Sequence, residues 1–486
     1  MLNQSIFFAI HPDAPKNMRV FGDKVYDPTK KKSNTRGSTT NSVGFESRDN
    51  QPTPGLQIPE LISSYKGGID TILFAFPNAP HFETNETAEA YKSLIKALRI
   101  GTNFIVVHYE ADREVIENWF TTLGHRISSI NWVPLPSYVD FTDWAEDAYV
   151  ALKDAYDETY YLMEPWEFPR SGDQIIADTV DEYTFLNSRQ APLIFQGGNC
   201  LVADDFWILG KDYYQDTINM INDNTLPLRP SQGQTIEDLV RKSFSDFVDQ
   251  RRPMFVAGTK KEITLPAYVG TKESGEFILD IVGAGTGPYQ PIFHIDMFIS
   301  LIGKNKDGLF EMMVGSPKLG NKLLGLPDRA HNLQEAYDEI ARSFKKQGIK
   351  VYRNPLVHFP EFTGREISIN YLRELAISNP TDRDILSVVK DFNNLGARDN
   401  DVALVRNWHH ITSNNCLVEN SEVYGKHVYL PTFGHGEYLS LSALDDQMKK
   451  LWEKYGFNVH QLGDFNSFAK RQGVVHCISK YIKRTD

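Results

Sequence analysis

The sequence predicts an α/β protein, because strand and helix patterns alternate along it and no linker divides them. Short apolar runs typical of buried strands alternate with amphipathic stretches typical of helices from about residue 65 onward. The 486 residues exceed a typical single domain, and a hydrophobic content of 41% is ordinary for a globular protein with a core of useful size. We therefore expect an extension over residues 1–60 and one large domain over residues 61–486.

The expected elements follow in order along the chain. The first are strands over residues 70–77 and 103–109, each followed by a helix that ends near a glycine, at residues 86–101 and 113–124. Further strands are expected over residues 206–210, 277–283, 293–303, 350–357, 427–433, 458–463 and 474–481. Helices are expected between them over residues 235–250, 333–348 and 441–456. This order indicates a strand-rich α/β unit that recurs, although sequence identity between the units is too weak to define a repeat.

Residues 29–54 differ from the rest, being polar, rich in Ser and Thr and nearly free of large apolar side chains. We expect a loop or a mobile arm there. Its basic cluster at residues 30–32 is more typical of a solvated linker than of a nucleic-acid site. The whole chain carries 51 Lys and Arg against 63 Asp and Glu, a net charge of −12. This charge argues against nucleic-acid binding and favours the approach of cationic ligands.

The three cysteines, Cys200, Cys416 and Cys477, form no CxxC pair, and their odd number suits a reducing compartment. The first residues lack a basic region, and the apolar run over residues 6–10 is too short for a signal peptide. No stretch approaches the roughly 20 apolar residues that a membrane span needs. We therefore expect a soluble cytoplasmic protein that does not bind membranes.

The first candidate for chemistry is Cys477, in RQGVVHCISK. Residues 474–478 alternate as in a strand, which would place His476 and Cys477 on opposite faces and make His476 a poor partner for the thiol. A lone cysteine in a strand is usually a buried, inert thiol. Gly473 allows a close backbone approach, which is a feature of binding and catalytic sites.

A second candidate is the His–Asp pair in FHIDMFISLIG. On a strand, His294 and Asp296 would emerge on the same face, beside an apolar run where an unpaired charge is costly. A structural pair and a functional pair explain this motif equally well. The upstream GAGTGPYQP lacks the GxGxxG spacing and leads into a strand, so we expect no nucleotide site there.

Two further segments are ambiguous when taken alone. Trp144 and Asp147, three residues apart, would form one patch on a turn, or would belong to the acidic face of a surface helix. Gly197, Gly198 and Asn199 lie between two apolar runs and read as a tight connection between strands. Neither segment indicates a function by itself.

Together these residues supply a thiol, an imidazole and two carboxylates, which is the set needed to attack a guanidinium carbon. Two carboxylates can hold the planar cation by its N–H groups. A thiolate can then attack the central carbon, ammonia leaves to give a thiouronium intermediate, and the imidazole transfers the protons. A cysteine protease would need only the Cys–His couple, so the two carboxylates favour a guanidino substrate.

The same segments resemble the guanidino-group modifying superfamily, the pentein enzymes, from about residue 65 to the C-terminus. The resemblance rests on WAED, GGN, HIDMF and GVVHC, in the order in which that superfamily has them. It is closest to the peptidylarginine deiminases. The passage before the cysteine, which begins LPTFGHGEYLSLS, is also similar to the corresponding passage of agmatine deiminases.

The resemblance implies a pentein fold, an α/β propeller of five ββαβ-like units around a central active site. It implies Cys477 as the nucleophile, His294 as the acid and base, and Asp147 with Asp296 as the clamp for the guanidinium. The substrate contacts that it implies are Trp144, Asn199 and an arginine between the WAED and GGN motifs, for which Arg170 and Arg189 are the two candidates. The implied reaction is hydrolytic deimination of peptidyl-arginine or a small arginine derivative, which releases ammonia and leaves a ureido product.

The sequence departs from the superfamily pattern at three places. Gln196 stands where many arginine and agmatine deiminases have an acidic residue, a change that is compatible with the peptidylarginine deiminases. Ala148 and Val150 stand where calcium-activated members have acidic ligands, so we expect no cofactor and no calcium activation through that site. Only a short extension precedes the expected catalytic domain over residues 61–486, without the immunoglobulin-like domains of those enzymes.

Two alternatives use the same inventory of residues. An amidinotransferase would resolve the intermediate with an amine instead of water, and a non-catalytic protein would bind arginine on a retained scaffold. We expect an arginine-containing peptide or a small guanidino compound as the partner. No motif specifies the oligomeric state, for which a dimer is the commonest outcome among soluble oligomers.

Overall fold

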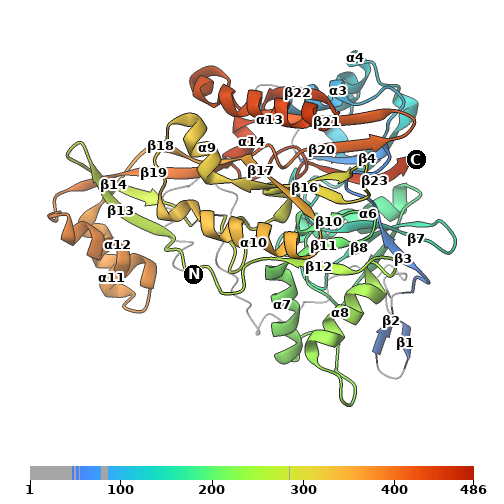
Figure 1. Cartoon of the computed structure of the whole chain (residues 1–486), viewed down its shortest axis with the longest axis horizontal. Coiled ribbons are helices and arrows are strands. Elements are labelled where there is room, and N and C mark those ends of the chain that lie inside the picture. The colour runs from blue at the N-terminus through green and yellow to red at the C-terminus, as the bar shows by residue number, and fades with distance from the viewer. Residues whose placement is uncertain (1–45, 49–50, 54, 78–85, 284, 486) are drawn as a thin grey trace.

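The computed structural model describes residues 46–48, 51–53, 55–77, 86–283 and 285–485. Within them the protein is a mixed α/β structure in which small sheets alternate with helices (Figure 1), as the sequence predicted. Most of the predicted polar arm lies outside the described residues, apart from the paired strands β1 (Glu46–Arg48) and β2 (Gln51–Thr53). No helix within the described ranges is long and apolar enough to cross a membrane.

Five sheets of the described chain share one topology: two antiparallel strands, a helical connection, and a third strand parallel to the second. The helical connection is needed because parallel neighbours cannot be joined by a tight turn. The strands of the five units are β7 (Val150–Asp154), β8 (Tyr160–Glu164) and β9 (Asn187–Gln190); β10 (Cys200–Val202), β11 (Trp207–Gly210) and β12 (Met254–Ala257); β15 (Ile299–Lys304), β16 (Phe310–Ser316) and β17 (Lys350–Pro355); β20 (Leu417–Ser421), β21 (Gly425–Thr432) and β22 (Asn458–Asp464); and β23 (Ser479–Thr485), β4 (Gly68–Phe76) and β5 (Asn103–Tyr109). β3 (Pro59–Leu61) extends the first of these sheets, and β6 (Ile130–Leu135) extends the last.

The connecting helices pack an apolar face against the sheets. They are α3 (Glu86–Ala97), α5 (Ser171–Gln174), α6 (Ile176–Tyr183), α7 (Lys211–Asn222), α8 (Ile236–Phe247), α9 (Pro317–Leu324), α10 (Gln334–Lys346) and α13 (Ser442–Lys454). In α10 the buried residues Tyr337, Ile340 and Phe344 recur every three or four positions, so one side of the helix is apolar. Further helices in and around these units are α4 (Arg113–Thr122), α14 (Asn466–Ala469), η1 (Glu110–Asp112), η2 (Ile127–Ser129), η5 (Ala330–Asn332) and η6 (Gly436–Leu441).

The sheet of β23, β4, β5 and β6 closes the chain on itself. Strands were predicted over residues 70–77 and 103–109, and the structure has β4 and β5 there. Phe74 of β4 and Phe104 of β5 are fully buried, with ring centroids 6.2 Å apart. β23 pairs with β4 in antiparallel register, which places Ser479 opposite Phe74. The last described strand is therefore held by one of the first.

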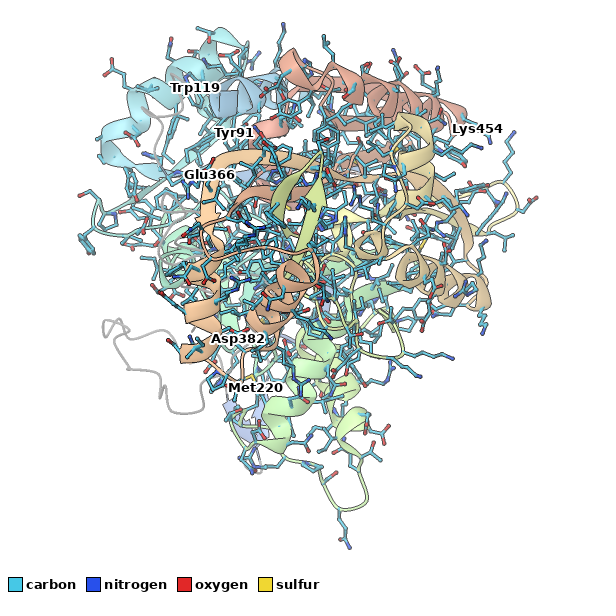
Figure 2. The ribbon with its side chains drawn as sticks, turned by 90° about the vertical axis from the view of Figure 1, so that its left-hand side faces the viewer. Tyr91, Trp119, Met220, Glu366, Asp382 and Lys454 are labelled. Carbon is cyan, nitrogen blue, oxygen red and sulfur yellow. The ribbon has the colours of Figure 1, made fainter. Side chains whose placement is uncertain are left out.

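A four-stranded sheet departs from this topology. It consists of β13 (Tyr268–Glu273), β14 (Glu276–Ile281), β19 (Val402–Ile411) and β18 (Val357–Ser368). With α11 (Ile369–Ser378) and α12 (Arg383–Asn394) it forms an extension at the left of Figure 1, which faces the viewer in Figure 2, where Glu366 and Asp382 are labelled. It has an apolar core of its own that includes Phe277 and Phe392. The sequence does not reveal this extension, because its apolar patterns are like those of the five units.

Three buried segments are short turns: the sequence predicted a tight connection for residues 197–199, and strands for the other two. Residues 197–199 form the 3-10 helix η3 (Gly197–Asn199), and residues 295–297 form the 3-10 helix η4 (Ile295–Met297). Residues 475–478 form a turn that ends where β23 begins. All three segments connect one sheet to the next, and their polar groups bond to one another across the connections. Alternation of apolar residues does not distinguish such buried turns from strands.

Candidate active site

Five connections between sheets converge at one place. Each immediately precedes the first strand of one of the five units: Asp147 comes before β7, Gly198 before β10, Asp296 before β15, Asn415 before β20 and Cys477 before β23. Bonds and close approaches join these connections to one another. The structure therefore brings together Cys477, His294, Asp147 and Asp296, the four residues to which the sequence analysis gave chemical roles.

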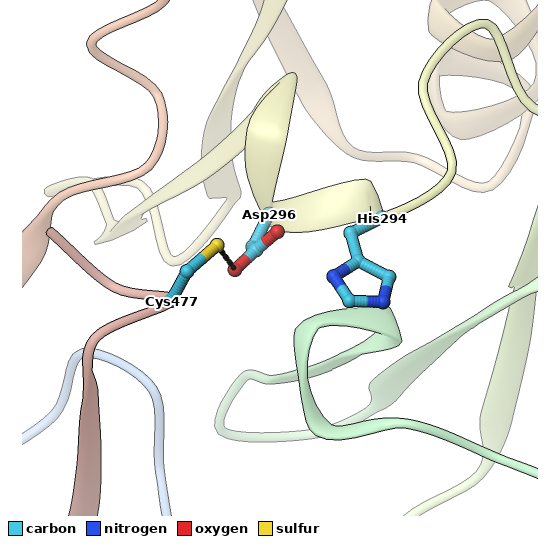
Figure 3. A group of neighbouring side chains, drawn as sticks. All are labelled: His294, Asp296 and Cys477. Atoms are coloured by element: carbon cyan, nitrogen blue, oxygen red, sulfur yellow. Dashed lines mark hydrogen bonds between the residues drawn. The ribbon is translucent and has the colours of Figure 1, made fainter. Parts of the chain in front are cut away.

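Cys477 lies at the end of the turn before β23 and is 2% exposed. Its thiol donates to Oδ2 of Asp296 at 3.9 Å, and Nδ2 of Asn415 donates to its sulfur at 3.2 Å. Figure 3 shows Asp296 between Cys477 and His294. The sulfur, one imidazole nitrogen and one carboxylate oxygen of these three side chains lie within 4.8 Å of one another. This spacing is compact enough for a single cation to contact all of them.

Asp296 is the most connected carboxylate of the cluster. Its Oδ2 accepts from Nδ2 of Asn415 at 2.8 Å and from Nδ1 of His476 at 2.8 Å, in addition to the thiol. Its Oδ1 is buried and has no hydrogen-bond partner among the described residues. One oxygen is thus fixed by the protein, and the other is available to accept from a ligand.

The contact of His476 with Asp296 corrects the sequence analysis. A strand over residues 474–478 would have placed His476 and Cys477 on opposite faces. The turn instead directs both side chains to Asp296, at 2.8 Å and 3.9 Å from the same oxygen. His476 therefore belongs to the site together with Cys477, its neighbour in the sequence.

His294 is held in place by the turn that contains Gly198. Its Nε2 lies 2.7 Å from Oε1 of Gln196, and its Nδ1 lies 3.7 Å from Oδ1 of Asp147. A Cβ on Gly198 would lie 2.5 Å from Nδ1 of His294, closer than packed atoms allow. Glycine is therefore required there, and a neutral carboxamide, Gln196, orients the imidazole.

Asp147 lies in a turn closed by its backbone N–H, which donates to the carbonyl of Trp144 at 3.2 Å. Of the two interpretations of this segment, a turn or a surface helix, the structure has the turn. Nη2 of Arg170 donates to Oδ2 of Asp147 at 2.8 Å, and the same guanidinium also pairs with Asp173. The sequence analysis assigned Arg170 to the substrate, but its guanidinium is bonded to these two carboxylates of the protein.

Trp144 is half-buried beside the cysteine turn. A Cβ on Gly473 would lie 2.2 Å from Cζ3 of Trp144, so this glycine lets the indole pack against the backbone. The guanidinium of Arg471 lies over the Trp144 ring at 4.9 Å and forms two hydrogen bonds with Asp143. The predicted role of Trp144 along a substrate remains a prediction.

Asn199 links η3 to the segment that leads to His294. It is fully buried, its Nδ2 donates to the carbonyl of Phe293 at 2.8 Å, and its Oδ1 accepts from Gln290 at 2.7 Å. Both ends of the amide are therefore bonded to the segment that leads to His294. The side chain therefore ties η3 to that segment, and a contact of Asn199 with substrate remains a prediction.

The electrostatics of the cluster depend on burial. Burial raises the pKa of Asp296 to about 7, and Asp147 adds to the rise while His294 and Asn415 oppose it. Burial also raises the pKa of Asp147, against the opposing charge of Arg170. Burial, followed by the charges of Asp296 and Asp147, raises the pKa of the Cys477 thiol well above its usual value. A cluster of this kind favours entry of a cation, which would stabilise every anionic form in it.

Asn415 is the site residue that the sequence analysis missed. Its Oδ1 accepts from the backbone N–H groups of His476 and Cys477, at 2.9 Å and 3.2 Å, while its Nδ2 reaches Asp296 and the sulfur. It lies in the polar run TSNN, between the apolar strands β19 and β20. A polar run between two buried strands was the signal that could have identified it.

Comparison with solved structures agrees with this architecture. A crystal structure of a putative agmatine deiminase is similar at a TM-score of 0.51 and 12% identity, covering 90% of this chain and 99% of that chain. An agmatine deiminase from C. jejuni (TM-score 0.49, 12% identity, 88% of this chain, 98% of that chain) is less similar. So is DDAH from Pseudomonas aeruginosa in complex with citrulline (TM-score 0.33, 10% identity, 85% of this chain, 99% of that chain). No protein-family model and no curated protein matches the sequence. The first likeness shows that this chain and the putative agmatine deiminase share a fold.

Proposed function

We propose that this protein is a hydrolase of guanidino groups, which deiminates an arginine derivative to a ureido product and ammonia. The observation that carries the proposal is a buried cluster of a thiol, an imidazole and a carboxylate. The sulfur of Cys477, a ring nitrogen of His294 and a carboxylate oxygen of Asp296 lie within 4.8 Å of one another. Asp147 adds a second carboxylate at 3.7 Å from the imidazole. This set matches a planar cation whose central carbon is to be attacked.

Binding is the first step of the proposed mechanism. The unpartnered Oδ1 of Asp296 accepts an N–H of the guanidinium, and Asp147 accepts another. The cation that enters favours the ionised forms of both carboxylates and of the thiol, whose pKa values burial raises. The substrate therefore helps to generate the nucleophile that attacks it.

The chemical steps exchange an amino group for oxygen. The Cys477 thiol passes its proton to His294, and the sulfur forms a bond to the guanidinium carbon. The carbon–nitrogen bond breaks as His294 protonates the departing ammonia, which leaves a thiouronium on Cys477. Water then attacks the carbon while His294 takes its proton, and the carbon–sulfur bond breaks to release the ureido product and the thiol.

The fold around this site is proposed to be a five-bladed α/β propeller. Support comes from the common topology of the five sheets and from the position of Asp147, Gly198, Asp296, Asn415 and Cys477, each before the first strand of its unit. A ring of such units would place the start of every first strand near one axis. In this proposal residues 61–486 form the catalytic domain, and the extension in Figure 1 lies outside the ring.

The test is a ureido-product assay on an Nα-blocked arginine amide beside free arginine and agmatine, with ammonia measured in parallel. The three substrates distinguish a peptide substrate from a small one. Each assay is run with calcium and with a chelator to test for calcium dependence. We expect equal amounts of ureido product and ammonia from at least one substrate, and complete loss in Cys477→Ala. Cys416→Ala, which removes a different buried thiol, is the matched control and should retain turnover.

The possible outcomes separate the competing functions. Transfer of the amidino group to an added amine, in place of ureido product, would make the protein an amidinotransferase. Tight binding of arginine compounds without any product, in folded protein at every pH, would overturn the hydrolase proposal. Turnover that survives Cys477→Ala would overturn the assignment of the nucleophile.

A further inference from the structure

A second pair of buried charged groups lies next to His476. Nζ of Lys480 donates to Oε1 of Glu146 at 2.8 Å, and these residues are 5% and 3% exposed. Oε2 of Glu146 is buried and has no hydrogen-bond partner in the part of the chain that the structure describes. Burial raises the pKa of Glu146, and Lys480 opposes the rise. A buried carboxylate oxygen without a partner is costly, so its position beside the site needs an explanation.

A small cavity lies against this pair. Its volume of about 20 Å³ is room for a single water molecule. The polar part of its lining consists of Glu146, Lys480, His476, Cys200, Ser64 and Tyr481. Nδ1 of His476 is bonded to Asp296, so Nε2 is the ring nitrogen available to a water molecule in this cavity.

The GGN turn makes room for the pair. A Cβ on Gly197 would lie 1.9 Å from the carbonyl oxygen of Glu146 and 2.6 Å from Nζ of Lys480. Gly198, the next residue, makes room for His294 in the same way. Stability is a weak reason to keep a buried ion pair, because apolar side chains of similar volume are often as stable. The placement of the pair beside His476 therefore indicates a role at the site.

We propose that Glu146, held by Lys480, positions His476 through one water molecule in this cavity and thereby controls the orientation and charge of Asp296. The water donates one hydrogen to Oε2 of Glu146 and the other to Nε2 of His476. This fixes the neutral imidazole with its Nδ1–H donating to Oδ2 of Asp296. Oδ1 of Asp296 then faces the substrate, so the consequence for turnover rests on the proposed function.

The charged and titratable groups around His476 come from five segments. They are Asp296 on η4, Glu146 and Asp147 on the turn before β7, Cys200 on β10, Cys477 in the turn before β23, and Lys480, Tyr481 and Arg484 on β23. Burial lowers the pKa of His476, which favours the neutral ring. Loss of the Glu146 charge leaves Lys480 as an unbalanced cation, which lowers the pKa of Asp296, whereas loss of Lys480 raises it.

The first test measures kcat/KM against pH for three variants. Glu146→Gln should lower kcat/KM about tenfold and shift the acid limb of its pH profile, where kcat/KM rises with pH, to lower pH. Lys480→Met should shift the acid limb to higher pH. The double variant should return the limb to near its original position. Asp249→Asn, which breaks the buried Asp249–Arg252 pair elsewhere, should lose stability without moving the limb. Shifts of the same sign in both single variants would overturn the proposal.

The second test needs no turnover. NMR of the protein labelled with ¹⁵N-histidine, with the His476 signal assigned from His476→Asn, reports which ring nitrogen carries the hydrogen. We expect the Nδ1–H form in the original protein and a mixture of forms in Glu146→Gln. An unchanged signal in Glu146→Gln would overturn the inference while leaving the hydrolase intact. A changed signal in a protein without turnover would uphold the inference and count against the proposed function.

Discussion

The side chain of Asn415 forms hydrogen bonds with both the side chain and the backbone of Cys477. Nδ2 of Asn415 donates to the sulfur at 3.2 Å, and Oδ1 accepts the backbone N–H of Cys477 at 3.2 Å. The same Nδ2 reaches Asp296 at 2.8 Å. A single carboxamide therefore fixes the distance between the proposed nucleophile and one carboxylate of the proposed clamp.

Asn415→Ala is expected to lower kcat/KM about 10- to 100-fold, the usual cost of removing a group that orients reacting side chains. Asn415→Asp should cost more, because a second carboxylate beside Asp296 would raise the pKa of both. Asn414→Ala is the matched control, since Asn414 is also buried but bonds to Asn354 and Ser300 instead. It should lower the melting temperature and leave kcat/KM within a few fold. Equal losses of kcat/KM in both alanine variants would contradict the role of Asn415.

Gly198→Ala is expected to reduce turnover about 100-fold, because the added Cβ would force His294 out of position. The Cβ would lie 2.5 Å from Nδ1 of the ring. Gly463→Ala is the control, because a Cβ there meets its nearest atoms at 3.4 Å, an ordinary contact. Steady-state kinetics and circular dichroism on both variants make the comparison. Full activity in Gly198→Ala would show that the position of His294 is not critical.

The pH dependence of kcat/KM should follow the carboxylate of Asp296. Its pKa is raised to about 7, chiefly by burial, so the protonated form prevails below that pH. Oδ1 of Asp296 accepts a guanidinium N–H far more strongly in the ionised form than in the protonated form, so kcat/KM should rise as pH increases through about 7. The rise of kcat with pH should occur at lower pH than the rise of kcat/KM, because the bound cation stabilises the ionised carboxylate. Rates measured from pH 5.5 to 9 test this, and activity that falls over the lower half of that range would contradict it.

The extension should make the fold acid-sensitive through its histidines. His358 on β18 and His410 on β19 are buried and stack with ring centroids 4.4 Å apart. Burial, with the neighbouring His409 and His331, lowers the pKa of His410 to about 3. The unfolded chain binds that proton near pH 6.5, so stability falls progressively as pH drops from about 6.5 toward 3.

At pH 5 this single histidine should cost about 2 kcal/mol of the free energy of unfolding relative to neutral pH. His410→Gln removes the titration and should lose correspondingly less stability between pH 7.5 and pH 5. Urea unfolding at both pH values measures the difference. Identical acid losses in the two proteins would show that His410 titrates alike in the folded and unfolded states.

The side chains of the candidate site could be predicted better than the backbone that carries them. Cys477, His294, Asp147 and Asp296 are ambiguous one by one, and they were predicted as a set from their combined chemistry and from the resemblance of their motifs to the pentein enzymes. Their local backbone structure was harder to predict. Strands were predicted at residues 293–303 and 474–481, yet η4 lies in the first of these segments and a turn lies in the second. A buried turn and a buried strand place apolar residues alike, and only the surrounding sheets decide between them.

The pairings of the residues that orient the site could not be predicted, for a different reason. The partners of Asn415 are Asp296 and Cys477, in other units of the fold. Likewise the guanidinium of Arg170 could be assigned to a substrate or to Asp147 with equal ease until the turn and α5 were placed together. Pairings between distant segments have no local sequence pattern, whereas alternating strands and helices do.

The pairing of β23 with β4 has a consequence for the nascent protein. β4 leaves the ribosome early and must wait for β23, the last described strand, before its sheet is complete. Cys477 immediately precedes β23, so the thiol reaches the cluster only when that strand docks. Every partial chain released before this point lacks both the thiol and one edge of the sheet. Assembly of this cluster therefore requires β23, and a chain that stops before β23 leaves the edge of β4 exposed to pairing with other chains.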